Sequence, residues 1–210
     1  LSFSRWAGWG DHRHPIHFSG DILSSWPMLA YEVAFTVTAA NVGCCYWSHD
    51  IGGFYGRRDP ELYARWLQFG ATTAALRLHS CGDELDRRPW LWDDWSVASF
   101  RSSFDLRGRL VPLLYGAMHR TYAEAKPFLR PLYHDDPDWE PAYRNPQCYR
   151  LADALISAPI VTPGCGPGRV ASQAVALPEG EWRQWFSGER YEGGEHLVQA
   201  DLQEMHRQLF

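Results

Sequence analysis

The strongest constraint on the fold is an alternation in the first two-thirds of the chain, where short apolar runs are followed by segments of helical spacing. A helix is predicted over 26–41, and Ser24 or Ser25 supplies its cap. Asp59 caps a second helix that ends at Gly70. Alternation of this kind is typical of βα units around a parallel sheet.

Two runs of strand length accompany these helices, at 42–47 and 71–78. We expect a long loop over 80–95 and then an amphipathic helix over 106–125, with a bend near Pro112. The first part of the chain is therefore predicted to be α/β.

The pattern changes after residue 127, where short strand-like runs lie between Pro, Gly and Asp turns. These runs cover 129–133, 150–161, 174–177 and 182–186. They predict an all-β module behind the α/β part. A complete parallel barrel takes about 250 residues, so a chain of 210 residues with a β module holds either a small open sheet or the last part of a barrel.

Composition narrows the classes of protein and partner. A net charge of −5 without a Lys/Arg cluster argues against nucleic acid as a partner. No apolar run approaches the roughly 20 residues of a membrane span, so no membrane partner is expected. Five Cys form an odd, sparse set that favours either a reducing compartment such as the cytoplasm or an incidental mix over a disulfide framework. The oligomeric state is left open.

Aromatic residues are abundant, with eleven Trp, ten Tyr and ten Phe. The flat apolar face of Trp suits a sugar ring or another planar ligand, whereas an aromatic-rich core is the ordinary alternative.

Polar residues stand where the expected strands end, which is where ligands collect in parallel α/β folds. They are Arg5, Asp21, Asp50 and His79. Each has a purely structural alternative: a surface ion pair for Arg5, a helix cap for Asp21, a turn for Asp50 and a core imidazole for His79. Their convergence on equivalent strand ends says more than any one of them.

Two other patterns point to chemistry less directly. His12 and His14 lie in a His-rich run with Asp11, but their spacing and the lack of a Cys pair argue against zinc, so no metal is predicted. Cys81 follows His79 without an evident oxyanion-forming turn, so a Cys–His nucleophile is not favoured.

Several motifs occur together in one order. They are RWAGWG at 5–10, FSGD at 18–21, YWSHDIGGF at 46–54, RW-x-QFG at 65–70, RLH at 77–79, LVPLLYGAMHRTY at 110–122, RPLY at 130–133, LISAPIVTPG at 155–164 and LPEGEWRQWFSGERYEGG at 177–194. With them the chain resembles glycoside hydrolase family 31, over nearly its whole length. The resemblance implies the C-terminal part of a (β/α)8 TIM barrel over 1–132 and the start of an all-β, β-sandwich domain over 133–210.

The resemblance also implies roles for single residues. Asp21 matches the general acid/base of a retaining glycosidase, which protonates the leaving oxygen and then deprotonates water. Substrate-binding positions are matched by Arg5, Phe18, Asp50, Phe54 and His79. The chemistry implies no metal and no other cofactor, and the partner is an oligosaccharide or α-glucoside substrate.

One element of the family is missing from the sequence. The family's nucleophile is an aspartate in a W-x-D-M-N-E segment upstream of the acid/base, and Trp90-Leu91-Trp92-Asp93 lacks the M-N-E part. Retaining hydrolysis needs two carboxylates about 5 Å apart. We therefore expect a fragment, inactive alone, of an α-glucosidase that releases terminal α-linked glucose. An α-xylosidase, an α-galactosidase, an α-glucosyltransferase and a non-catalytic sugar-binding remnant are the alternatives.

Overall fold

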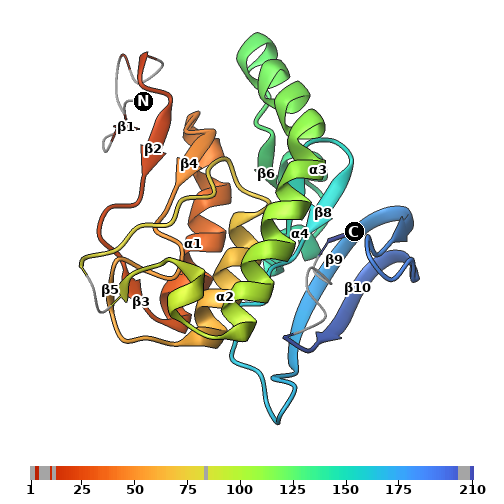
Figure 1. Cartoon of the computed structure of the whole chain (residues 1–210). Coiled ribbons are helices and arrows are strands. Elements are labelled where there is room, and N and C mark those ends of the chain that lie inside the picture. The colour runs from red at the N-terminus through yellow and green to blue at the C-terminus, as the bar shows by residue number, and fades with distance from the viewer. Residues whose placement is uncertain (1–2, 5–9, 11–12, 83–84, 203–208) are drawn as a thin grey trace.

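The computed structural model describes residues 3–4, 10, 13–82, 85–202 and 209–210. In Figure 1 the N-terminal α/β part and the C-terminal β hairpin lie on opposite sides of the long helix α3. The helices are α1 (Trp26–Thr38), α2 (Pro60–Gly70), α3 (Asp94–Glu124) and α4 (Pro141–Arg144), with 3-10 turns η2 (Ala39–Val42), η4 (Pro89–Leu91) and η5 (Leu132–His134). The strands are β1 (Phe3–Ser4), β2 (Ile16–Phe18), β3 (Leu23–Ser24), β4 (Tyr46–Ser48), β5 (Tyr55–Gly56), β6 (Leu129–Pro131), β7 (Tyr149–Leu151), β8 (Leu155–Ser157), β9 (Ala171–Arg183) and β10 (Arg190–Ala200).

The α/β part is built on a parallel sheet in the order β1-β2-β4. Phe18 at the end of β2 pairs with Ser48 at the end of β4, so the two following loops leave the sheet at the same level. A second short parallel pair joins β3 to β5. The predicted βα organisation is confirmed.

The first two helices begin as their sequences predict. The Ser25 hydroxyl accepts a hydrogen bond from the Met28 amide at the start of α1, and the Asp59 carboxylate accepts one from the Leu62 amide at the start of α2. Trp66 and Phe69 of α2 are fully buried in the main core. Burial of this apolar surface is the main stabilising contribution of α2.

The strand predicted over 71–78 is wrong. The amides and hydroxyls of Thr72 and Thr73 bond back to the carbonyls of Phe69 and Gly70 at 2.9–3.2 Å, so the end of α2 continues as a turn. The rest of the run forms no strand in the described part of the chain, although the Ile51 amide donates to the Arg77 carbonyl at 3.3 Å and Arg107 donates to the Ala74 carbonyl at 2.7 Å.

Helix α3 begins twelve residues before the predicted start at 106, inside the predicted loop over 80–95. Asp93 caps it by accepting the Ser96 amide at 2.7 Å. Ser96, Ser99 and Ser103 are buried on one face, and the Ser99 hydroxyl donates to the Ala64 carbonyl of α2 at 2.8 Å. The contact between α3 and α2 is therefore made by small hydroxyl residues, which the spacing of hydrophobic residues cannot reveal.

Among the described residues, no helix combines the length and the apolar character of a membrane span.

The C-terminal part consists of the antiparallel sheet β6-β7-β8 and the hairpin of β9 and β10. The run predicted as one strand over 150–161 is two, because Ala152 turns with φ 53°. The predicted runs at 174–177 and 182–186 belong to one strand, β9, as far as residue 183, whereas 184–186 lies outside it. Strand β10 was not predicted.

In the α/β part, the strand expected over 42–47 begins only at Tyr46, after the turn at Gly43. The domain boundary at residue 132 stays a prediction; β6 pairs with β7.

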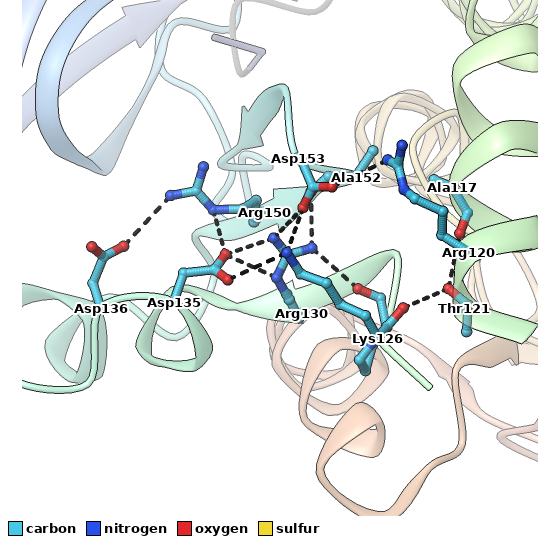
Figure 2. A network of polar contacts seen from close by, with 11 residues as sticks. Ala117, Arg120, Thr121, Lys126, Arg130, Asp135, Asp136, Arg150, Ala152 and Asp153 are labelled. Atoms are coloured by element: carbon cyan, nitrogen blue, oxygen red, sulfur yellow. Dashed lines mark hydrogen bonds and ion pairs between the residues drawn. The ribbon is translucent and has the colours of Figure 1, made fainter. Parts of the chain in front are cut away.

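A network of ion pairs joins the end of α3 to β6 and β7 (Figure 2). We call it the joint network, and its members are Arg120, Lys126, Arg130, Asp135, Asp136, Arg150 and Asp153. Arg130 is buried at its centre, where its nitrogens bond Asp135 and Asp153 at 2.6–2.8 Å and the carbonyls of Pro127 and Ala152 at 3.0–3.2 Å. Each cation of the joint network thus faces an anion, so no buried charge in it is left uncompensated.

Candidate active site

Six side chains gather where β2, β4 and the extended segment after α2 end. We call them the strand-end cluster, and its members are Phe18, Asp21, Asp50, Phe54, Arg77 and His79. Five of the six were predicted from the sequence. The remaining predicted residue, Arg5, lies outside the described residues.

Asp50 is the buried carboxylate of the cluster. Its Oδ1 accepts a hydrogen bond from Nη1 of Arg77, whereas its Oδ2 has no hydrogen-bond partner in the part of the chain that the structure describes. Burial raises the pKa of Asp50 to about 6, Arg77 opposes that rise, and the charge of Asp21 adds to it. Asp50 therefore keeps one buried acceptor oxygen free of hydrogen bonds from the described residues.

Aromatic rings flank these charges. The Arg77 guanidinium lies 4.5 Å from the centre of the Phe18 ring, and the rings of Phe54 and His79 are 5.4 Å apart. Desolvation and the charge of Arg77 lower the pKa of His79, while Asp21 opposes this shift. A neutral, exposed imidazole beside a ring is suited to hydrogen-bonding an uncharged ligand.

Asp21 is the exposed carboxylate of the cluster. It lies in the bend after β2, behind Gly20, whose φ is 78°. Helix α1 is capped by Ser25, so Asp21 is not the cap of that helix. Asp21 influences the pKa values of both Asp50 and His79, which brings the three predicted polar residues together electrostatically.

The turn after β4 gives Asp50 its position. The Gly53 amide bonds the Asp50 carbonyl at 2.8 Å, and Gly52 and Gly53 both have positive φ, at 85° and 87°. A Cβ on Gly53 would lie 2.5 Å from the Ser24 amide nitrogen. Arg87 holds the Gly53 carbonyl from Nε and Nη2 at 3.2 and 2.7 Å. Only glycine fits this approach of two loops.

Four polar residues in or next to the strand-end cluster were not predicted as site residues. They are Arg77, which is a member of the cluster, and Glu32, His49 and Arg87, which surround it. Arg77 stands two positions before His79, and Glu32 interrupts an apolar helix, so both carried a sequence signal. His49 is buried, accepts the Trp66 indole N–H at 3.1 Å, and has its pKa lowered to about 3 by burial. Arg87 lies far from the motif that it supports and gave no such signal.

No metal centre is evident among the residues that the structure describes. Within the described ranges, no group of three or more His, Cys, Asp or Glu could hold a metal ion. His12 of the His-rich run lies outside those ranges.

Comparison with known proteins places the chain in a family. Residues 1–117 match the family description "Glycosyl hydrolases family 31 TIM-barrel domain", and residues 125–210 match "Glycosyl hydrolase family 31 C-terminal domain". The chain thus consists of part of a TIM barrel followed by a β domain, as predicted, and it belongs to glycoside hydrolase family 31.

Individual relatives agree with this assignment. A 1,3-alpha-isomaltosidase of Kribbella flavida is 33% identical over 96% of this chain, and an alpha-xylosidase of Emericella nidulans is 30% identical over 92%. A cycloalternan-degrading enzyme from Trueperella pyogenes, solved in complex with a covalent intermediate, superposes with a TM-score of 0.86 at 29% identity over 96% of this chain and 28% of its own. The chain spans 28% and 25% of the lengths of the two curated relatives.

Proposed function

We propose that the chain carries the acid/base half of a retaining α-glycoside hydrolase that releases terminal α-linked glucose from oligosaccharides. The observation that supports it most strongly is that exposed Asp21, after β2, lies close enough to buried Asp50, after β4, and to His79 for its charge to act on both. The covalent intermediate named for the Trueperella enzyme is consistent with a retaining reaction in a relative.

Each residue then has one task. Asp21 protonates the glycosidic oxygen as the leaving sugar departs, and it takes a proton from the water that enters afterwards. The unpartnered Oδ2 of Asp50 accepts a hydrogen bond from a hydroxyl of the bound sugar while Arg77 holds Oδ1 in place. His79 bonds a second hydroxyl, and Phe18 and Phe54 form apolar walls. The family resemblance assigns a sugar contact to Arg5 as well, which lies outside the described residues.

The second carboxylate must come from elsewhere. Retention requires a nucleophile about 5 Å from the acid/base, and we propose that an aspartate of the upstream barrel supplies it in longer relatives. The isolated chain then binds sugar without cleaving it.

A fusion tests this function. The chain is joined behind the part of the Kribbella isomaltosidase that precedes the matched segment, and the first anomer released from isomaltose is read by proton NMR. We expect the α-anomer, and we expect Asp21→Asn to lower kcat by about 10²–10⁴-fold. Asp153→Asn, in the joint network, is the matched control and keeps the activity. A β-anomer, or an Asp21→Asn variant with unchanged kcat, contradicts the proposal.

The similarity to an alpha-xylosidase supports a second candidate within the same reaction. Aryl α-xyloside and aryl α-glucoside are compared on the same fusion. A higher kcat/KM for the xyloside would assign the chain to α-xylosides without changing the role of Asp21.

A further inference from the structure

A carboxyl group is buried in the apolar helix α1, directly behind the proposed acid/base loop. Glu32 is 1% exposed, with Leu29 and Val33 buried on the same helix. An ionised carboxylate in such surroundings is costly unless hydrogen bonds compensate it. A side chain of this type therefore calls for a specific partner.

That partner is the first residue of the acid/base loop. The Ser19 hydroxyl donates to Oε2 of Glu32 at 2.7 Å, and the same hydroxyl oxygen accepts the Trp47 indole N–H at 2.7 Å. The Ser19 amide bonds the Ser48 carbonyl at 3.1 Å. Ser19 is thus tied to α1 and to β4 at once, through the relay Trp47–Ser19–Glu32.

The loop that leaves this anchor is short. Gly20, with φ 78° and no heavy atom of the described residues within 4 Å of where a Cβ would be, is the one residue in sequence between Ser19 and Asp21. A displacement of Ser19 is therefore passed to Asp21 through one residue of unusual conformation, and no other described backbone hydrogen bond lies between them.

The charges around Glu32 make the anchor depend on protonation. Burial raises the pKa of Glu32 to about 7, the Ser19 bond opposes the rise, and the charge of Asp50 adds to it. Asp50 in turn faces Arg77, Asp21 and Arg87. Ionised Glu32 can only accept a hydrogen bond, which holds the Ser19 hydroxyl in one orientation; protonated Glu32 also carries a donor that competes with it.

We propose that Glu32 is a positioning residue for Asp21, acting through the Ser19 hydroxyl to fix the loop that carries the acid/base. The importance of this for catalysis rests on the function proposed for Asp21. The coupling between Glu32 and the loop does not rest on that function, because all the groups that it joins belong to this chain.

The coupling is measurable in the full 210-residue chain without substrate. Nitrogen-15 NMR follows the Trp47 indole N–H and the Gly20 amide from pH 5 to pH 9. Both signals are expected to move in one shared step near pH 7, the value to which burial brings the pKa of Glu32. Glu32→Gln is expected to abolish that step and to hold both signals near their low-pH positions, because Gln is the neutral isostere.

Matched variants separate Glu32 from its neighbours. Asp21→Asn leaves the shared step in place, and Asp50→Asn leaves it but moves its midpoint to lower pH. Ser19→Ala cuts the relay: the Glu32 carboxyl, followed by carbon-13, still titrates, but the Gly20 amide no longer follows it. This variant also answers the question if Glu32→Gln does not fold.

Two results overturn the proposal. One is a Gly20 amide that does not follow the Trp47 indole in the wild-type chain, and the other is a Gly20 amide that still follows Glu32 in Ser19→Ala. Either would remove the positioning role and leave the fusion test of Asp21 untouched. A failed fusion test would conversely leave this coupling intact.

Discussion

The strand-end cluster and the joint network use the same residue types in opposite ways. In the joint network, Arg130 bonds two aspartates and two carbonyls, and contacts with Lys126 and Arg130 lower the pKa of Asp153 to about 2. In the cluster, burial raises the pKa of Asp50 to about 6, and one of its oxygens has no described partner. Paired charges stabilise a joint between elements, whereas incompletely paired charges at strand ends form a site for a ligand.

The largest contrast concerns the turn that carries Asp50. Gly53→Ala is expected to lower the free energy of unfolding by about 3 kcal/mol, because a Cβ would overlap the Ser24 backbone at 2.5 Å. Gly82→Ala is the matched control, since Gly82 has φ 83° and no heavy atom of the described residues lies within 4 Å of the position a Cβ would take. It should lose only about 1 kcal/mol. Urea unfolding measures both, and equal losses would contradict the close approach of the two loops.

The stability that Glu32 contributes should depend on pH. A carboxyl whose pKa is raised on folding stabilises the fold most below its unfolded value, and this stability is lost as pH rises through the folded value. For Glu32 these values are 4.5 and about 7. The stability of wild type relative to Glu32→Gln should therefore increase by about 2 kcal/mol between pH 8 and pH 5. A difference that stays constant with pH would refute the buried, pH-sensitive carboxyl.

Asp153 should behave in the opposite direction. Its pKa is lowered, from 3.8 to about 2, so its stabilising contribution is present above pH 4 and is lost as the pH falls toward 2. Because the side chain is 46% exposed, the difference between wild type and Asp153→Asn should stay below about 1 kcal/mol. Urea midpoints at pH 5 and pH 2.5 measure it.

Removing the central cation should weaken the joint. Arg130→Ala leaves Asp135 and Asp153 without their buried partner, and because both are partly exposed we expect a loss of about 2 kcal/mol. Arg144→Ala removes the exposed pair with Glu195 and should cost about 0.5 kcal/mol at most. If both variants unfold at the same urea concentration, the joint network does not stabilise the fold as described.

At Asp50 a small effect on stability should accompany a large effect on binding. Asp50→Asn should change the free energy of unfolding by less than about 1 kcal/mol at pH 7, since relief of a buried charge offsets the lost Arg77 pair. It should weaken isomaltose binding by about tenfold or more, measured by NMR titration. Asp153→Asn should leave the affinity unchanged. If Asp153→Asn weakened isomaltose binding and Asp50→Asn did not, the strand-end cluster would not be the sugar site.

The sequence predicted those parts of the molecule whose signals are local. Caps, prolines and glycines placed α1 and α2, and the expected strand ends placed Asp21 after β2 and Asp50 after β4. The start of α3 escaped because buried serines, rather than apolar residues, contact α2. The supposed strand at 71–78 failed because its threonines bond back to the preceding helix.

The parts of the site that depend on distant contacts could not be predicted. Arg87 reaches the Gly52–Gly53 turn across more than thirty positions, and no spacing rule connects them. The relay from Trp47 to Glu32 joins three elements through one serine hydroxyl. Such contacts follow from packing in three dimensions, because each group alone has an ordinary role as core or cap.

Sugar binding at the strand-end cluster is tested most directly by mapping it on the isolated chain. Isomaltose is titrated into the nitrogen-15-labelled protein, and the shifted signals are assigned. We expect shifts at the amides of Gly20, Asp21 and Gly53 and at the His79 ring, and in Asp50→Asn the same shifts should need about tenfold or more isomaltose. Shifts confined to the exposed Trp185 of the C-terminal part, or no shifts at all, would contradict the assignment of the strand-end cluster as the sugar site.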